Sequence, residues 1–130
     1  MKLTYLALLA ATAAVLVCAS SAMARSFPTT ITHDGSVALG ATGSFVDSGR
    51  VRSPKTFCQF FRIVKLVGHY PGGTTKLLDV DFTSARGAWG TKADLTGADR
   101  VTARATRFAF RRHGHRKVCL ADAISFVPGP

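Results

Sequence analysis

The chain has 130 residues and a formal net charge of +10 at pH 7, and 47% of its residues are hydrophobic. This length is enough for one domain and too short for a doubly wound or barrel enzyme, while the apolar content is too high for a disordered chain. All seven acidic residues are Asp. Because helix-rich proteins usually use Glu, its absence favours β structure.

Residues 1–24 have the three-part pattern of a secretory signal peptide. Lys2 gives a basic start, an apolar run extends from Leu3 to Val17, and Ala22-Met23-Ala24 places small residues where a signal peptidase cleaves. The run is shorter than the roughly 20 residues that span a bilayer, so we expect cleavage rather than a membrane anchor. A lipoprotein with Cys18 as the lipid site is the alternative. The sequence therefore predicts a secreted or periplasmic protein with no membrane span in the mature chain.

Two cysteines, Cys58 and Cys119, would remain after this cleavage. In an exported chain an even pair indicates a disulfide, and two buried free thiols are the alternative. A disulfide between them would close a loop of roughly 60 residues, for which the loop-entropy model gives a stabilisation of about 4 kcal/mol.

The remaining chain is expected to consist of a loose N-terminal arm, residues 25–42, and one domain, residues 43–130. The arm has turn residues and no sustained period, although its few apolar residues allow an edge strand. In the domain, short stretches of alternating polarity lie between turns; they cover residues 44–52, 58–67, 74–82, 88–95, 101–110 and 118–127. With an edge strand in the arm these six stretches give about seven short strands, and this spacing predicts an all-β sandwich.

Two of these stretches indicate how their strands face the core. Residues 58–67 are apolar on both faces, which predicts a central strand. In 74–82, three apolar residues alternate with Asp79 and Asp81, so we expect the apolar side to face inward and both carboxylates to face solvent, balanced by cations of a neighbouring strand. A carboxylate pair for hydrolysis or calcium binding is the alternative.

A series of spaced residues extends over nearly the whole domain. It consists of Gly49-Arg50-Val51, Cys58, Arg62-x-Val64-x-Leu66, Thr83-x-x-x-Gly87-x-Trp89, Val101-x-Ala103, Cys119 and Ser125. The series resembles small secreted bacterial domains of the carboxypeptidase regulatory-like type, in the transthyretin-like (prealbumin-like) group, and departs from their pattern at Ser84, where the family has Asp. The resemblance implies a seven-stranded Ig-like or transthyretin-like sandwich that acts as an accessory or interaction domain without catalytic residues.

The most distinctive stretch is a basic hairpin centred on Gly114. Its five fixed positive charges are Arg107, Arg111, Arg112, Arg116 and Lys117. Such a cluster attracts phosphate, sulfate or carboxylate polymers, and Arg favours paired contacts to these groups. Phe108 and Phe110 could add a stacking face, as in single-strand binders, or belong to the core, in which case the charges are simply solvated. Outside the cell, anionic envelope polymers or another secreted protein are better partners than nucleic acid.

Metal binding and catalysis have weaker support. His113 and His115 are weak candidates for a zinc or copper site, which would need a further ligand from His33, His69 or an Asp. The chain has no Gly-x-Ser-x-Gly turn and no phosphate-binding P-loop, and an active site would need a pocket joining His69 or His113 to an Asp. We therefore expect no cofactor and no enzyme. The sequence predicts a secreted, non-catalytic binding or structural module; a cationic binder of polyanions and a metal-binding or hydrolytic protein are the alternatives.

Overall fold

The computed structural model describes residues 24–129, which form ten strands and one short 3-10 helix. Apart from Ala24, the predicted signal peptide lies outside these residues. The elements are β1 (Arg25–Phe27), β2 (Thr30–Ala38), β3 (Ser44–Arg52), η1 (Thr56–Cys58), β4 (Ile63–His69), β5 (Thr75–Phe82), β6 (Ala88–Asp94), β7 (Arg100–Ala105), β8 (Phe108–Arg112), β9 (His115–Cys119) and β10 (Asp122–Phe126). Within residues 24–129, no helix has the length and apolar character needed to cross a membrane.

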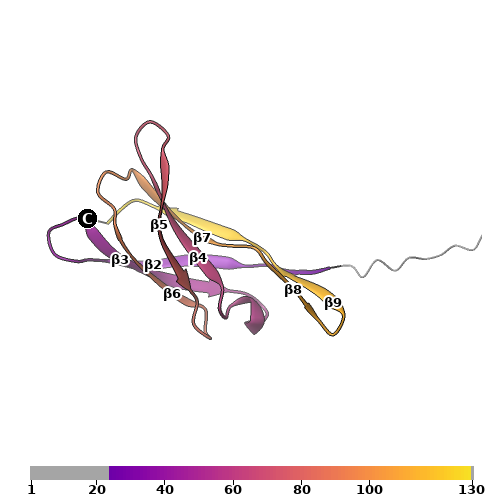
Figure 1. The fold of residues 1–130 in the computed structure, drawn as a ribbon. Coiled ribbons are helices and arrows are strands. Elements are labelled where there is room, and N and C mark those ends of the chain that lie inside the picture. The colour runs from indigo at the N-terminus through magenta and orange to yellow at the C-terminus, as the bar shows by residue number, and fades with distance from the viewer. Residues whose placement is uncertain (1–23, 130) are drawn as a thin grey trace, which may run out of the picture.

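The strands form three sheets, so the predicted all-β class is confirmed. One sheet has four strands in the order β10-β7-β4-β5, and the others have the orders β2-β3-β6 and β1-β9-β8. Neighbouring strands are antiparallel except β1 and β9, which are parallel. Figure 1 shows the β8–β9 hairpin extending away from the other two sheets. The third sheet is therefore an extension on one end of the body.

The four-stranded and the first three-stranded sheet share one hydrophobic core. Its buried members are Ile31, Phe45, Val51, Val64, Leu66, Trp89, Ala93, Leu95, Val101, Ala103 and Ala105. In β3 and β7 the buried residues alternate with exposed or half-buried ones, as strands with one covered face require. The indole of Trp89 also donates a hydrogen bond of 3.2 Å to the carbonyl of Thr32, which joins β6 to β2 across β3.

The N-terminal segment differs from the predicted loose arm. β1 pairs with β9, and β2 pairs with β3 over almost its whole length. The backbone N–H of Ile31 donates to the carboxylate of Asp122 at 2.9 Å, and the Ile31 side chain is buried in the core. The register of β2 shifts between His33 and Gly35. This irregularity interrupts the alternation, which explains why the sequence shows no sustained period there.

The number of strands is also higher than the expected seven. Residues 101–110 divide into β7 and β8, and residues 118–127 contain the end of β9 and all of β10. The division follows from the sheets: β7 and β10 pair with each other in the four-stranded sheet, whereas β8 and β9 leave it and pair in the third sheet.

The stretch from Cys58 begins as a loop rather than a strand. Cys58 ends the 3-10 helix, and β4 begins only at Ile63. Phe61 has a φ of 55°, in the left-handed region, so the chain cannot continue as a strand through it. Phe60 and Phe61 are both more than half exposed. From Ile63 onward the prediction is confirmed, because β4 lies between β5 and β7 in the interior of its sheet.

Strand β5 differs from the prediction in its second half: Leu78 packs against the core as expected, but the apolar residues after it face the other way. Val80 and Phe82 are 41% and 50% exposed. Asp79 and Asp81 pair with Leu66 and Val64, which are fully buried, so both carboxylates lie on the inner side of the sheet.

The two carboxylates find their partners on the neighbouring sheet. Asp81 Oδ2 accepts the backbone N–H of Gly90 at 2.7 Å, and Asp79 Oδ2 accepts that of Lys92 at 2.8 Å. Both donors belong to β6, the edge strand that lies beside β5. The carboxylates therefore join the edges of the two larger sheets and satisfy backbone donors that have no strand partner on that side.

Candidate functional site

The basic hairpin forms as predicted, with its turn at His113 and Gly114. Both residues have positive φ, 51° and 73°. A two-residue turn of this kind matches the right-handed twist of antiparallel strands, and Gly114 adopts it without steric cost. The hairpin therefore holds β8 and β9 in a fixed register, and this register determines where each cation points.

The register divides the hairpin cations between two faces. Arg111 is directly opposite Arg116, so these two side chains share one face. Arg112 lies opposite His115 and belongs to the other face. Arg107 precedes β8 in the link from β7. The structure thus places the five predicted cations around one projecting element, but not in a single cluster.

None of these cations has a carboxylate partner within residues 24–129, where the one ion pair is between His33 and Asp47. The nearest acidic residues in the sequence are Asp99 and Asp122, outside the hairpin. Four of the five side chains are exposed, and Lys117 is half-buried. The field of the hairpin is therefore positive on both faces and is screened only by solvent.

Aromatic rings connect the hairpin to the rest of the molecule. The Phe57 ring on η1 packs edge-on against Phe110 and against Phe27, with centroid separations of 5.2 Å in both cases. Lys117 Nζ lies 5.6 and 5.8 Å from the ring centroids of Phe27 and Phe57, a cation–π arrangement. Phe110 thus belongs to a small cluster at the base of the hairpin, whereas Phe108 is 48% exposed.

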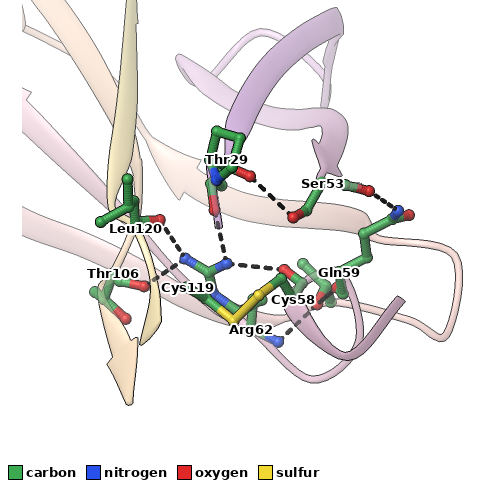
Figure 2. Close-up of a disulfide and its surroundings, with 10 residues drawn as sticks. Thr29, Ser53, Cys58, Gln59, Arg62, Thr106, Cys119 and Leu120 are labelled. Carbon is green, nitrogen blue, oxygen red and sulfur yellow. Dashed lines mark hydrogen bonds between the residues drawn. A yellow bond between two sulfur atoms is a disulfide. The ribbon is translucent and has the colours of Figure 1, made fainter. Parts of the chain in front are cut away.

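A disulfide lies at the base of the hairpin, as predicted (Figure 2). It joins Cys58 at the end of η1 to Cys119 at the end of β9, with 5.4 Å between the Cα atoms. Both cysteines are fully buried. The strand that carries Arg116 and Lys117 is therefore covalently attached to the segment that leads into β4.

Arg62 lies beside the disulfide and is the largest buried polar side chain among residues 24–129, with 1% exposure. Figure 2 shows its guanidinium among acceptors from four segments. It donates to the carbonyls of Cys58 at 2.8 Å, Thr106 at 2.7 Å and Leu120 at 3.0 Å, and to the Thr29 hydroxyl at 3.0 Å.

These acceptors explain what Arg62 holds together. Thr106 precedes the hairpin and Leu120 follows it, while Thr29 links β1 to β2. Burial lowers the pKa of Arg62, because the charged guanidinium loses solvent without gaining a carboxylate. Its charge is balanced only by carbonyl and hydroxyl dipoles, and these contacts close the base of the hairpin against the body.

The weak metal candidates remain without further ligands in the described part of the chain. His113 lies at the turn and His115 on β9, and no group of three His, Cys, Asp or Glu side chains in residues 24–129 could hold a metal ion. Within residues 24–129, His69 forms no hydrogen bond or ion pair with an Asp side chain. Its Nε2 lies 2.8 Å from the Thr102 hydroxyl, which in turn lies 2.8 Å from that of Ser125.

Sequence reasoning missed a polar cluster formed by His33, Ser36 and Asp47. His33 Nε2 lies 2.9 Å from Asp47 Oδ1 and 3.2 Å from Ser36 Oγ, and the Ser36 hydroxyl donates to the same carboxylate oxygen. A catalytic triad needs the carboxylate on one ring nitrogen and the hydroxyl on the other. Here the same ring nitrogen of His33 contacts both the carboxylate and the hydroxyl. The cluster therefore has the residues of a triad but cannot pass a proton from the hydroxyl through the ring. Its signal in the sequence was Asp47, the polar residue on the apolar side of 44–52.

The cluster is built into the interior of the body. Asp47 is fully buried, and the His33 ring stacks on Phe126 of β10 with a centroid separation of 3.6 Å. It therefore joins β2, β3 and β10 across the core.

Comparison of the chain with models of protein families, with curated proteins and with solved structures found no match. The resemblance to carboxypeptidase regulatory-like and transthyretin-like domains stays a prediction from the residues.

Proposed function

We propose that the protein is an exported, non-catalytic binding module that holds anionic polymers through its β8–β9 hairpin. The observation that carries this proposal is the projecting hairpin with five fixed cations and no carboxylate partner in residues 24–129. An exposed positive surface of this kind raises the local concentration of anions and speeds their association.

Two features support export to an oxidising compartment. The first 24 residues have the signal-peptide pattern, and the Cys58–Cys119 disulfide is of the kind that persists outside the cytosol. We therefore propose a secreted or periplasmic location, with cleavage after Ala24.

The arrangement of the sheets supports an Ig-like or transthyretin-like sandwich. The two sheets that enclose the core have four and three strands, and the β1-β9-β8 sheet is an addition at one end. In this proposal the sandwich is a rigid support, and the added sheet presents the binding surface.

A polymer fits the hairpin better than a small anion does. Arg111 and Arg116 lie on one face and Arg112 on the other, so a single small anion cannot contact all three. A chain with repeated phosphate, sulfate or carboxylate groups can wrap the hairpin and contact several guanidinium groups at once. We expect Lys117 to contribute less, because it is half-buried above two aromatic rings.

The test is retention on immobilised heparin with elution by a salt gradient. Changing Arg111, Arg112 and Arg116 to Ser should shift elution to lower salt. It should also reduce the slope of log Kobs against log [salt] by about one for each cation that contacts the polymer.

A matched variant controls for net charge. Lys65→Ser, Arg100→Ser and Arg104→Ser remove the same three charges from exposed positions on β4 and β7. This control should elute close to the unchanged protein. Equal losses in both triple variants would mean that overall charge alone drives retention, and the hairpin proposal would be wrong.

A further inference from the structure

A second basic surface lies where the end of β3 meets the turn before β6. It is a pocket of about 370 Å³ lined by Arg50, Arg52, Ser53, Gln59 and Arg86. Arg50 and Arg52 are two apart on β3, so they point to the same outer side of the sheet. Arg86 comes from the turn between β5 and β6. Three arginines from two elements therefore line one open pocket.

The pocket contains no negative charge of its own. No Asp is among its lining residues, and none of its three arginines forms an ion pair within the described residues. Like charges held around one open pocket repel each other, and a bound counter-ion would offset the repulsion that solvent leaves.

The turn that carries Arg86 is fixed on β3 by its backbone. The carbonyl of Gly87 accepts the N–H of Val51 at 2.8 Å. Gly87 has a φ of 81°, and a Cβ at this position would overlap the carbonyl oxygen of Val51. Glycine is therefore required for this approach. The Arg86 backbone is thus set beside β3 before any ligand arrives.

Ser84 completes the same turn. Its hydroxyl accepts the N–H of Ala88 at 3.1 Å, and its carbonyl accepts the N–H of Gly87 at 2.9 Å. The departure of Ser84 from the family pattern thus leaves the turn hydrogen-bonded.

The other side of the pocket is held by polar contacts. Gln59 Nε2 donates to the carbonyl of Ser53 at 2.7 Å, and the Ser53 hydroxyl donates to the carbonyl of Pro28 at 2.9 Å. Because the amide of Gln59 has two N–H donors, one remains available to a ligand. Gln59 also directly follows Cys58, so the disulfide restrains this wall.

We infer that this pocket binds a single tetrahedral oxyanion, a phosphate or sulfate group. Each guanidinium presents a planar fork of N–H donors that matches two oxygens of such a group. The group can be a free inorganic ion or the end of a larger monoester, since both present the same oxygens. The inference does not depend on the hairpin, which uses different residues.

The test is a titration of the protein with inorganic phosphate, followed by NMR of the arginine Nε–Hε signals at constant ionic strength. We expect saturable shifts at Arg50, Arg52 and Arg86. Arg52→Gln and Arg86→Gln should each weaken binding roughly tenfold, the loss expected for one charge-assisted hydrogen bond. All three arginines are exposed, so these variants should keep the fold, as circular dichroism can verify.

The matched control is Arg104→Gln, an exposed arginine on β7. It should leave the affinity for phosphate unchanged. A second titration with glycerol 3-phosphate distinguishes the two sources, because tighter binding of the monoester assigns the site to a linked phosphate and equal binding assigns it to the free ion.

Two results would overturn the inference. One is a phosphate titration without saturation at the pocket arginines, or with equal weakening in Arg104→Gln. The other is loss of phosphate binding in the variant with Arg111, Arg112 and Arg116 changed to Ser, which would place the anion on the hairpin. Failure of heparin retention would refute the proposed function and leave this site unaffected.

Discussion

Replacing Arg62 with Met should destabilise the fold by about 4 kcal/mol. Met is about as long as the aliphatic stem of Arg and has no hydrogen-bond donor, so it fills the space of the stem and leaves the four acceptors of the guanidinium without their partner. Three of these acceptors are backbone carbonyls, and one is the Thr29 hydroxyl.

The magnitude follows from two opposing effects. A hydrogen bond from a charged group contributes about 1.5–3 kcal/mol, so four such bonds would give a larger total. Burial of the guanidinium opposes this, as its lowered pKa and the absence of a partner for Nε indicate. A net value of about 1 kcal/mol for each bond gives the expected loss, which is a large part of the 5–15 kcal/mol typical of a folded domain.

The assay is urea unfolding followed by fluorescence of Trp89, the only tryptophan, which is buried in the core. Arg104→Met is the matched control, because Arg104 is exposed on β7, and it should change the free energy of unfolding by less than about 0.5 kcal/mol. Arg62→Lys keeps the charge but loses the planar fork of donors. Its loss of unfolding free energy should therefore lie between those of Arg62→Met and Arg104→Met. A loss below about 1 kcal/mol in Arg62→Met, or a Lys variant as stable as the unchanged protein, would refute this reasoning.

Two further predictions concern the disulfide and one carboxylate. Changing Cys58 and Cys119 together to Ala should lower the free energy of unfolding in urea by about 4 kcal/mol; a change below about 1 kcal/mol would contradict the loop-entropy estimate. The hydroxyl and backbone N–H of Thr96 lower the pKa of Asp94 below its usual value of 3.8. These hydrogen bonds therefore stabilise the folded state above pH 3.8, and their contribution is lost as the pH falls through the lowered pKa. In Thr96→Ala the pKa of Asp94, measured by carboxyl NMR titration, should rise toward 3.8, and an unchanged value would disprove the role of the hydroxyl.

Alternation along the sequence matches the buried and exposed faces of β7, but in β5 it predicted the inward side correctly only for Leu78. In β7 the buried residues Val101, Ala103 and Ala105 are small or apolar, and their neighbours are polar. In the second half of β5 the polar side is the inner side, because Asp79 and Asp81 accept hydrogen bonds from the backbone of β6. A polarity pattern identifies two faces, but it cannot show that a carboxylate has found a backbone donor on another strand.

Pairing between distant segments was the main feature that the sequence did not reveal. β2 was predicted as part of a loose arm because the irregularity at Asp34 interrupts its period, yet it is held by β3 and by the Asp122 carboxylate. The burial of Arg62 was equally hidden, since arginine is seldom buried and the acceptors that solvate it come from four separate segments.

The hairpin was predictable and the arginine pocket was not, for the same physical reason. The turn at Gly114 and the cations around it are close in sequence, so local turn chemistry is enough to place them. Arg86 reaches Arg50 and Arg52 only because the Gly87 turn docks on Val51 of a different strand. A site built by strand contacts becomes visible only when the fold is known.

Unpaired cations favour anion binding but disfavour folding, because like charges repel in the compact state. In this structure, different parts of the molecule carry the unpaired cations and stabilise the fold. The cations lie on an exposed hairpin and on the rim of an open pocket, where solvent weakens their repulsion. The buried disulfide and Arg62 hold the base of the hairpin, and the Cys58 end of the same disulfide borders the pocket wall at Gln59. The same buried contacts therefore restrain both proposed anion-binding surfaces without lying in either of them.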